Sequence, residues 1–213
     1  MSLNQLQTGV QQVADGANPV ARSGKTGETI VSELQGPYYE NAYRGNVFVA
    51  AQTAATAAIA TAAGGATLVL FNPSNNTKNL VILDVTVCLE TETGQTAKVA
   101  FQLAGAATGT TQTLTTPLTG LSSIVGGSNK PSGVTLVSST FSNAAVPLRY
   151  LGALSQAATN TTGVTGVVSF KDEVKGAIIV PPGSYVGIYG LTAGTIGDAS
   201  IVASMTWAEV NAL

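Results

Sequence analysis

Paired carboxylates are the residues of this sequence that could support catalysis, because a glycosidase needs two carboxyl groups about 5–9.5 Å apart. Asp84 and Glu90 share one face of an alternating segment, but six residues of strand separate their side chains by about 20 Å. Glu90 and Glu92 are same-face neighbours beside a turn, and we interpret them as solvated charges at a strand end. Asp172 and Glu173 are adjacent, so they would point to opposite faces of a strand. The carboxylates therefore predict no glycosidase site.

Histidine is absent from the chain, and Cys88 is its only cysteine. Without histidine, the sequence lacks the usual general base of Ser-His-Asp and Cys-His catalysis and the commonest ligand of transition metals. A single cysteine forms neither an intrachain disulfide nor a zinc site, and we interpret Cys88 as a small core residue of a strand. We therefore predict no enzymatic activity, no catalytic residue and no metal.

The segment SGKTGE, residues 23–28, contains a Gly-Lys-Thr triplet that occurs in phosphate-binding loops. The full motif needs another glycine five residues before the glycine of that triplet, where this chain has Pro19. No apolar strand precedes the segment and no helical pattern follows it. The chain also lacks the closely spaced Asp and Asn oxygens of a calcium loop. We therefore predict no nucleotide and no other cofactor.

Aromatic side chains gather in the segment GPYYENAYRGNVF, residues 36–48. Tyrosine combines an apolar body with a polar tip and is enriched at protein interfaces, and an arginine among tyrosines can stack on their rings. Two interpretations stay open. The rings either anchor the segment to its own domain or dock on a neighbouring subunit or another protein. The candidate interface residues are Tyr38, Tyr39, Tyr43, Arg44 and Phe48.

Charged residues make up only 9% of the chain, and its formal net charge at pH 7 is −2. This balance excludes the broad basic surface with which proteins bind nucleic acid. The sequence begins without the basic and apolar stretches of a signal peptide, and no apolar run reaches 18 residues. We therefore expect no membrane span, and folding in a cytoplasm without secretion.

Apolar residues that alternate with polar ones predict strands from residue 67 onward. In LVILDVTVCLE, residues 80–90, a period of two places Val81 and Val85 on one face and Ile82 and Asp84 on the other. Residues 104–133 read as a long loop rich in Gly, Thr, Ser and Pro. Further strands are predicted at 134–141, 145–154, 164–170, 176–180, 184–191 and 199–210.

The last predicted strand contains the only tryptophan, Trp207, on an apolar face, which makes it a core anchor. No segment after residue 66 has a convincing helical period. We therefore predict an all-β, jelly-roll-like two-sheet β-sandwich over residues 49–213, preceded by an extended N-terminal arm over residues 1–48 that ends in the aromatic segment.

The segment RSGKTGETIVSELQGPYYENAYRGNVF, from Arg22 to Phe48, resembles small virion structural proteins of tailed bacteriophages. The ending, where VPPGSYVGIYG precedes ASMTWAEV, resembles them as well. This resemblance implies a non-enzymatic, jelly-roll-like capsid cement (decoration) protein that trimerises and stabilises the shell. It implies that the partners are further copies of the chain, the major capsid protein or neighbouring virion subunits, with the protein located in a virion assembled in the host cytoplasm.

One alternative is kept beside the capsid interpretation. A head-fibre or tail accessory module of similar fold would bind carbohydrate at the host surface. The side chains expected to serve such binding are Tyr185, Tyr189 or members of the loop 104–133.

Overall fold

The structure is a computed structural model. The chain divides into two compact units, Met1–Tyr39 and Glu40–Leu213. The predictions for residues 1–35, including most of the arm and the Gly-Lys-Thr triplet, lie outside the described residues. The structure describes residues 36–53, 56–57, 68–91, 98–115, 117–127, 130–136, 139–155, 169–190 and 200–212.

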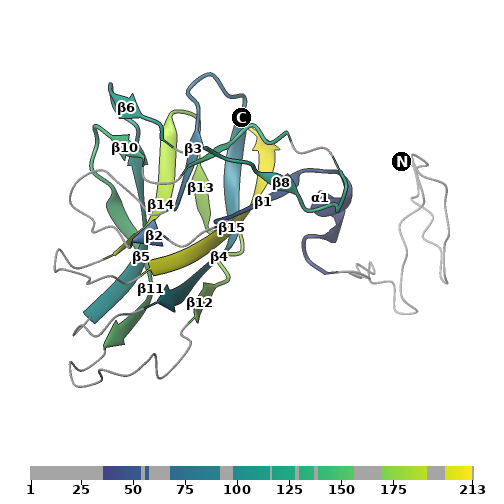
Figure 1. Cartoon of the computed structure of the whole chain (residues 1–213). Coiled ribbons are helices and arrows are strands. Elements are labelled where there is room, and N and C mark those ends of the chain that lie inside the picture. Colours follow the sequence, from purple (N-terminus) through teal and green to yellow (C-terminus); the bar gives the residue numbers. More distant parts are fainter. Residues whose placement is uncertain are drawn as a thin grey trace, which may run out of the picture. The chain divides into compact units, whose positions relative to one another are not determined.

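The larger of two antiparallel sheets joins β12, β4, β15, β1 and β8 in that order, with β13 also paired to β4 and β2 to β15 (Figure 1). Its centre is the long pair β4–β15, which aligns Lys78 with Asn211 at one end and Thr91 with Ser200 at the other. Its strands are β1 (Val47–Ala51), β2 (Thr56–Ala57), β4 (Lys78–Thr91), β8 (Leu121–Ser122), β12 (Ser169–Asp172), β13 (Ile178–Val180) and β15 (Ser200–Asn211).

The second sheet has the order β11-β5-β14-β3-β9-β7, and β10 and β6 form a separate pair. The order is not that of the sequence, so strands far apart in the chain become neighbours, as β3 and β14 do. Its strands are β3 (Leu68–Asn72), β5 (Lys98–Ala107), β7 (Pro117–Leu118), β9 (Val134–Leu136), β11 (Val146–Ser155) and β14 (Ser184–Gly190), and the separate pair is β6 (Gln112–Thr113) with β10 (Thr140–Phe141).

The two sheets pack on each other around one apolar core, to which β1, β4 and β15 of the larger sheet and β3, β5 and β14 of the second sheet contribute. Trp207 is fully buried there, and its ring centroid lies 6.0 Å from that of Phe48. The predicted alternation of the last strand is confirmed, since Ile201, Ala203 and Met205 are buried with Trp207. The predicted all-β two-sheet sandwich is therefore confirmed, and the jelly-roll connectivity stays a prediction.

The predicted facing of residues 80–90 is wrong for the first part of that strand. Val81 was expected on the same face as Val85 and opposite to Ile82, but Val81 is half-buried, whereas Ile82 is fully buried. Val85 and Val87 face the core. The side-chain alternation is therefore inverted between Ile82 and Val85.

A β-bulge at Leu83 causes the inversion. On β15, Trp207 is aligned with Ile82 and its neighbour Thr206 is aligned with Asp84. Leu83, which lies between Ile82 and Asp84, therefore has no partner position on β15. One extra residue in a strand moves the following side chains to the other face. The backbone amides of Lys175 and Gly176 donate hydrogen bonds to the carbonyls of Leu83 and Ile82, each at 2.8 Å. The turn between β12 and β13 thus satisfies the carbonyls at the bulge.

The segment 104–133, predicted as a long loop, contains regular structure. β5 continues to Ala107, and three two-residue strands, β6, β7 and β8, follow it. Each of them pairs with a strand from another part of the chain, namely β10, β9 and β1. A strand of two residues is too short to show an alternation of apolar and polar residues, so the sequence did not predict these strands.

A short helix, α1 (Tyr39–Tyr43), precedes β1 and was not predicted. Gly45 follows it with a φ of 73°, the left-handed conformation that commonly ends a helix. β1 then begins at Val47, so the domain boundary predicted between residues 48 and 49 falls inside a strand. Within the described ranges, no helix is long and apolar enough to cross a membrane.

Replacing Phe48 and Tyr43 by alanine should have opposite outcomes for stability. Phe48 is 5% exposed and stacks on Trp207, so Phe48→Ala should lower the free energy of unfolding by about 3–5 kcal/mol. Tyr43 is 64% exposed, so Tyr43→Ala should change it by less than about 0.5 kcal/mol. Urea unfolding followed by tryptophan fluorescence measures both, and equal losses would show that Tyr43 is also a core residue.

Candidate functional site

The candidate interface residues are divided between the surface and the core. Tyr39 and Tyr43 are 47% and 64% exposed, Arg44 is exposed, and Tyr38 is half-buried. Phe48 was expected at the interface, but it is buried in the sandwich core, and this expectation is therefore corrected. The reason is its place in β1, opposite Trp207 of β15, which turns the ring toward the space between the sheets.

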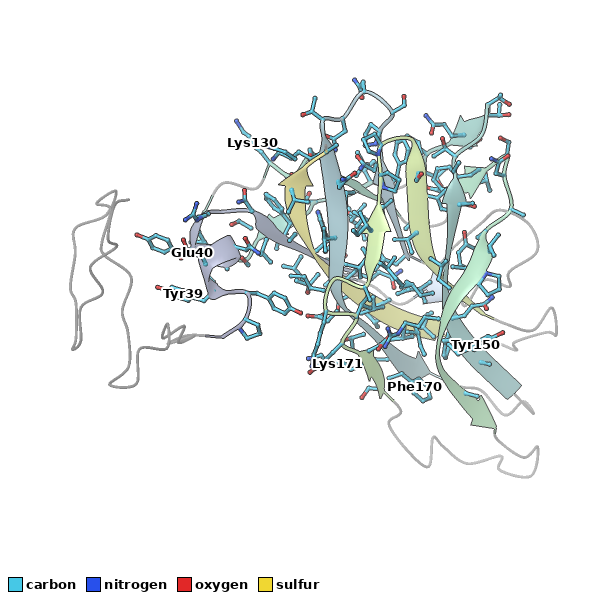
Figure 2. The ribbon with its side chains drawn as sticks, turned by 180° about the vertical axis from the view of Figure 1, so that it is seen from behind. Tyr39, Glu40, Lys130, Tyr150, Phe170 and Lys171 are labelled. Carbon is cyan, nitrogen blue, oxygen red and sulfur yellow. The ribbon has the colours of Figure 1, made fainter. Side chains whose placement is uncertain are left out.

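Two pairs of side chains in and beside α1 are spaced four residues apart. Tyr39 and Tyr43 lie one turn apart, and residues four apart share a helix face. Glu40 and Arg44 form the second such pair, in which Arg44 Nε donates to Glu40 Oε1 at 2.7 Å. Figure 2 shows Tyr39 and Glu40 projecting outward from the helix. The helix therefore presents tyrosine rings beside an exposed ion pair that contributes little to stability.

Exposed apolar side chains gather along a second surface, which we name the apolar edge: Val146, Leu148, Tyr150 and Ile179. Their exposed fractions are 61%, 50%, 69% and 56%. The first three belong to β11, the edge strand of the second sheet, and Ile179 belongs to β13. A cavity of 160 Å³ brings Leu148 and Ile179 together, with Pro181 also in its lining. The apolar edge thus continues across the margins of both sheets.

The margins of the two sheets are joined beside the apolar edge. Arg149 of β11 and Asp172 of β12 form an ion pair, with Nε and Oδ2 2.6 Å apart. Phe170 of β12 packs so closely on Gly152 of β11 that a Cβ at Gly152 would collide with its ring. Figure 2 shows Tyr150 and Phe170 on the same side of the molecule. The backbone that carries the apolar edge is therefore held in place.

The carboxylates are bound to other groups rather than gathered in a reactive site. Besides Glu40 and Asp172, Glu173 pairs with Lys175 at 3.0 Å, and Asp84 accepts a hydrogen bond from Thr206 at 3.1 Å. Among the described residues, no group of three or more His, Cys, Asp or Glu side chains could hold a metal ion. Glu92 and the side chain of Glu90 lie outside the described residues.

Glu209 is a buried carboxylate that the sequence did not single out. Its side chain is fully buried at the end of β15. Oε1 accepts the backbone amides of Ser132 at 2.6 Å and Gly133 at 3.0 Å, and Oε2 accepts the Ser132 hydroxyl at 2.7 Å. Lys78 Nζ of β4 lies 3.1 Å from Oε2, and Trp207 Nε1 is 3.5 Å from Oε1.

These donors keep Glu209 ionised. Burial by itself raises the pKa of this carboxyl, but the hydrogen bonds from Ser132, Gly133 and Lys78 outweigh burial and hold the pKa below the ordinary value of 4.5. Ser132 and Gly133 lead into β9 of the second sheet, whereas Glu209 and Lys78 belong to the larger sheet. Glu209 is therefore a structural tie between the sheets.

The tyrosines expected to bind carbohydrate are buried, which corrects that expectation. Tyr185 and Tyr189 are 2% and 0% exposed on the outer face of the second sheet. Tyr185 stacks on Phe141 with ring centroids 3.9 Å apart, and its hydroxyl donates to the carbonyl of Asn143 at 2.7 Å. Burial raises the pKa of both phenols. The two rings form a second small core under the β6–β10 pair.

Replacing Glu209 with glutamine should destabilise the fold in a pH-dependent way. A carboxyl whose pKa is lowered on folding contributes stability above its unfolded pKa of about 4.5, and that contribution disappears as the pH falls through the folded pKa. At pH 7, Glu209→Gln should therefore lower the free energy of unfolding by about 1–3 kcal/mol, because charge-assisted hydrogen bonds are lost. Below about pH 4, the difference from the wild type should shrink.

Urea unfolding at a series of pH values measures this difference, and Glu40→Gln is a matched control because Glu40 is exposed in a surface ion pair. The control should leave the unfolding curve nearly unchanged at each pH. A Glu209→Gln loss that stays constant from pH 7 to pH 3 would contradict the assignment of an ionised carboxylate.

Comparisons with known proteins identify no family. No protein-family model matches the chain, and neither the curated proteins nor the solved structures give a match. Its function is therefore inferred from the surfaces and buried groups of the chain itself.

Proposed function

We propose that this chain is a non-enzymatic bacteriophage virion protein that trimerises and stabilises a capsid shell as a cement (decoration) protein. The apolar edge is the observation that carries the proposal. Four exposed apolar side chains, Val146, Leu148, Tyr150 and Ile179, lie along sheet margins instead of being scattered. A long edge strand with exposed apolar side chains is a surface that other chains pair with, and contiguous apolar patches mark interaction sites.

Self-association through the apolar edge is the contact that we propose for a closed ring. β11 is ten residues long and forms the margin of its sheet, and the cavity beside Ile179 lies next to it. A side chain of one copy that enters the cavity of the next makes a heterologous contact, and in the proposed trimer three such contacts close around a threefold axis. Stable interfaces bury about 1,600 Å² in total, so residues beyond the apolar edge would join the contact.

The helix α1 supplies the second surface that the proposal requires. Tyr39, Tyr43 and Arg44 are exposed, and tyrosine and arginine are the residue types enriched at the energetic centres of interfaces. In the proposed assembly these side chains and Tyr38 dock on the capsid lattice or on a neighbouring virion subunit. The resemblance to phage virion proteins includes this same segment and supports the assignment, and the implied jelly-roll connectivity belongs to the same proposal.

The state of the carboxylates supports a non-enzymatic role. A general acid or base needs a carboxyl whose pKa is shifted toward the working pH. Glu209, the most deeply buried carboxylate described, is shifted in the opposite direction and is occupied by structural hydrogen bonds. The glutamates and aspartates described near the surface are paired with lysine, arginine or threonine.

Light scattering of the purified full chain should give a mass of three times 21.4 kDa. Placing a charge in the apolar edge by Leu148→Glu or Ile179→Glu should reduce the mass to that of one chain, because an unpaired charge would be buried in the contact. Val125→Glu is the matched control, since Val125 is fully exposed and lies outside the apolar edge. A wild-type chain that is monomeric throughout the micromolar range would overturn the proposed trimer.

A further inference from the structure

A polar cavity of 380 Å³ lies at one end of the second sheet, and none of the residues of the apolar edge or of α1 belongs to its lining. One wall is the turn after β3, and the other is the segment that connects β5 to β6. The volume falls within the range of about 300–1,000 Å³ for small-molecule sites. The lining of the cavity includes Phe71, Ser74, Asn75, Thr108, Thr110 and Gln112.

Hydrogen bonds fix the wall that follows β5. The Thr108 amide donates to the carbonyl of Gly183 at 2.9 Å, and the Ser142 hydroxyl donates to the carbonyl of Thr108 at 3.3 Å. Gly109 has a φ of 74°, and a Cβ there would collide with the side chains of Ser142 and Asn143. The backbone of this wall is therefore held in a conformation that requires glycine at position 109.

The opposite wall is fixed by the buried Asn72. Its side-chain amide donates to the carbonyls of Val180 at 2.8 Å and Lys78 at 2.9 Å. Its Oδ1 accepts the side-chain amide of Asn76 at 2.6 Å, and the Asn76 backbone amide closes the turn onto Pro73 at 3.0 Å. Ser74 and Asn75 are thus presented from a rigid turn, so that little conformational entropy is lost when a ligand binds.

The chemistry of the lining selects a neutral ligand rich in hydroxyl groups. Among the residues that the structure describes, no charged side chain lines the cavity, so none of them would neutralise a phosphate or carboxylate there. Ser74 and Thr110 offer hydroxyls, and Asn75 and Gln112 offer carboxamides that both donate and accept hydrogen bonds. Within the described part of the chain, these two carboxamides make no hydrogen bond.

We propose that this cavity binds a neutral saccharide, through the carboxamides of Asn75 and Gln112 and the hydroxyls of Ser74 and Thr110. The site goes beyond the proposed assembly role and does not depend on it. A few hydrogen bonds to a solvated sugar give weak affinity, so we expect a dissociation constant on the order of 1 mM for each site. Several sites on one particle would raise the overall affinity through multivalency.

The test is an amide-resolved NMR titration of the full chain with neutral trisaccharides of glucose, galactose, mannose and N-acetylglucosamine. We expect at least one of them to shift the amide signals of residues 74–75 and 108–112 with a midpoint in the millimolar range. Asn75→Ala and Gln112→Ala should each weaken binding by about 3- to 10-fold, the effect of one lost hydrogen bond. Thr113→Ala is the matched control, because Thr113 is the exposed neighbour of Gln112 in β6 and does not line the cavity.

Three outcomes would overturn the proposal: no shift with any trisaccharide at 20 mM, shifts confined to residues outside the cavity, or tighter binding of the charged sugar N-acetylneuraminic acid. The oligomeric mass is read from the same samples by light scattering, so a monomer that still binds a trisaccharide would refute only the assembly role. A trimer that binds none would refute only the saccharide site.

Discussion

The buried carboxylate of Glu209 is the constraint on which much of this structure depends. An ionised group in a protein interior is costly unless its lone pairs are satisfied, and here two backbone amides, a hydroxyl and a lysine satisfy them. The donors come from residues 78 and 132–133, which are far from residue 209 in the chain. The hydrogen bonds and the ion pair that this one carboxylate forms therefore fix where the chain enters β9 and where β4 begins.

The segment that donates hydrogen bonds to Glu209 is also closely packed on the core. A Cβ at Gly133 would lie 2.7 Å from a methyl group of Leu80, so the segment that donates to Glu209 also rests directly on the core. A similar device, the buried Asn72, joins β3 to β4 and β13. Polar ties of this kind leave sheet margins and connecting segments in defined positions. The apolar edge and the polar cavity are both built on such fixed backbone.

Sequence reasoning succeeded where the signal is local. Alternation in the last strand correctly placed Trp207 and its neighbours in the core, because a strand of period two needs no knowledge of its partners. The all-β class followed from several such segments. The bulge at Leu83 could not be foreseen, since it exists only through the alignment of β4 with β15. Phe48 was grouped with the exposed tyrosines by proximity in sequence, whereas its place in β1 decides its burial.

The functional residues show the same division. The tyrosines and arginine near α1 were singled out by composition, and their exposure agrees with a surface role. Glu209 had no local signal, because a single glutamate in a strand reads as a solvated charge until residues 132–133 are brought to it. The apolar edge was missed for a related reason. Val146 and Leu148 look like ordinary core residues of a strand, and only the order of the sheets shows that β11 lies at a margin.

The most direct measurement is the titration of the Glu209 side-chain carboxyl by carbon-13 NMR, assigned with the Glu209→Gln variant. If this carboxylate is ionised and fully engaged in holding the two sheets together, its midpoint should lie below 4.5. A midpoint of 6 or higher would mean a protonated, buried carboxyl near neutral pH, which is the property of a general acid. That result would contradict both the structural tie and the non-enzymatic role.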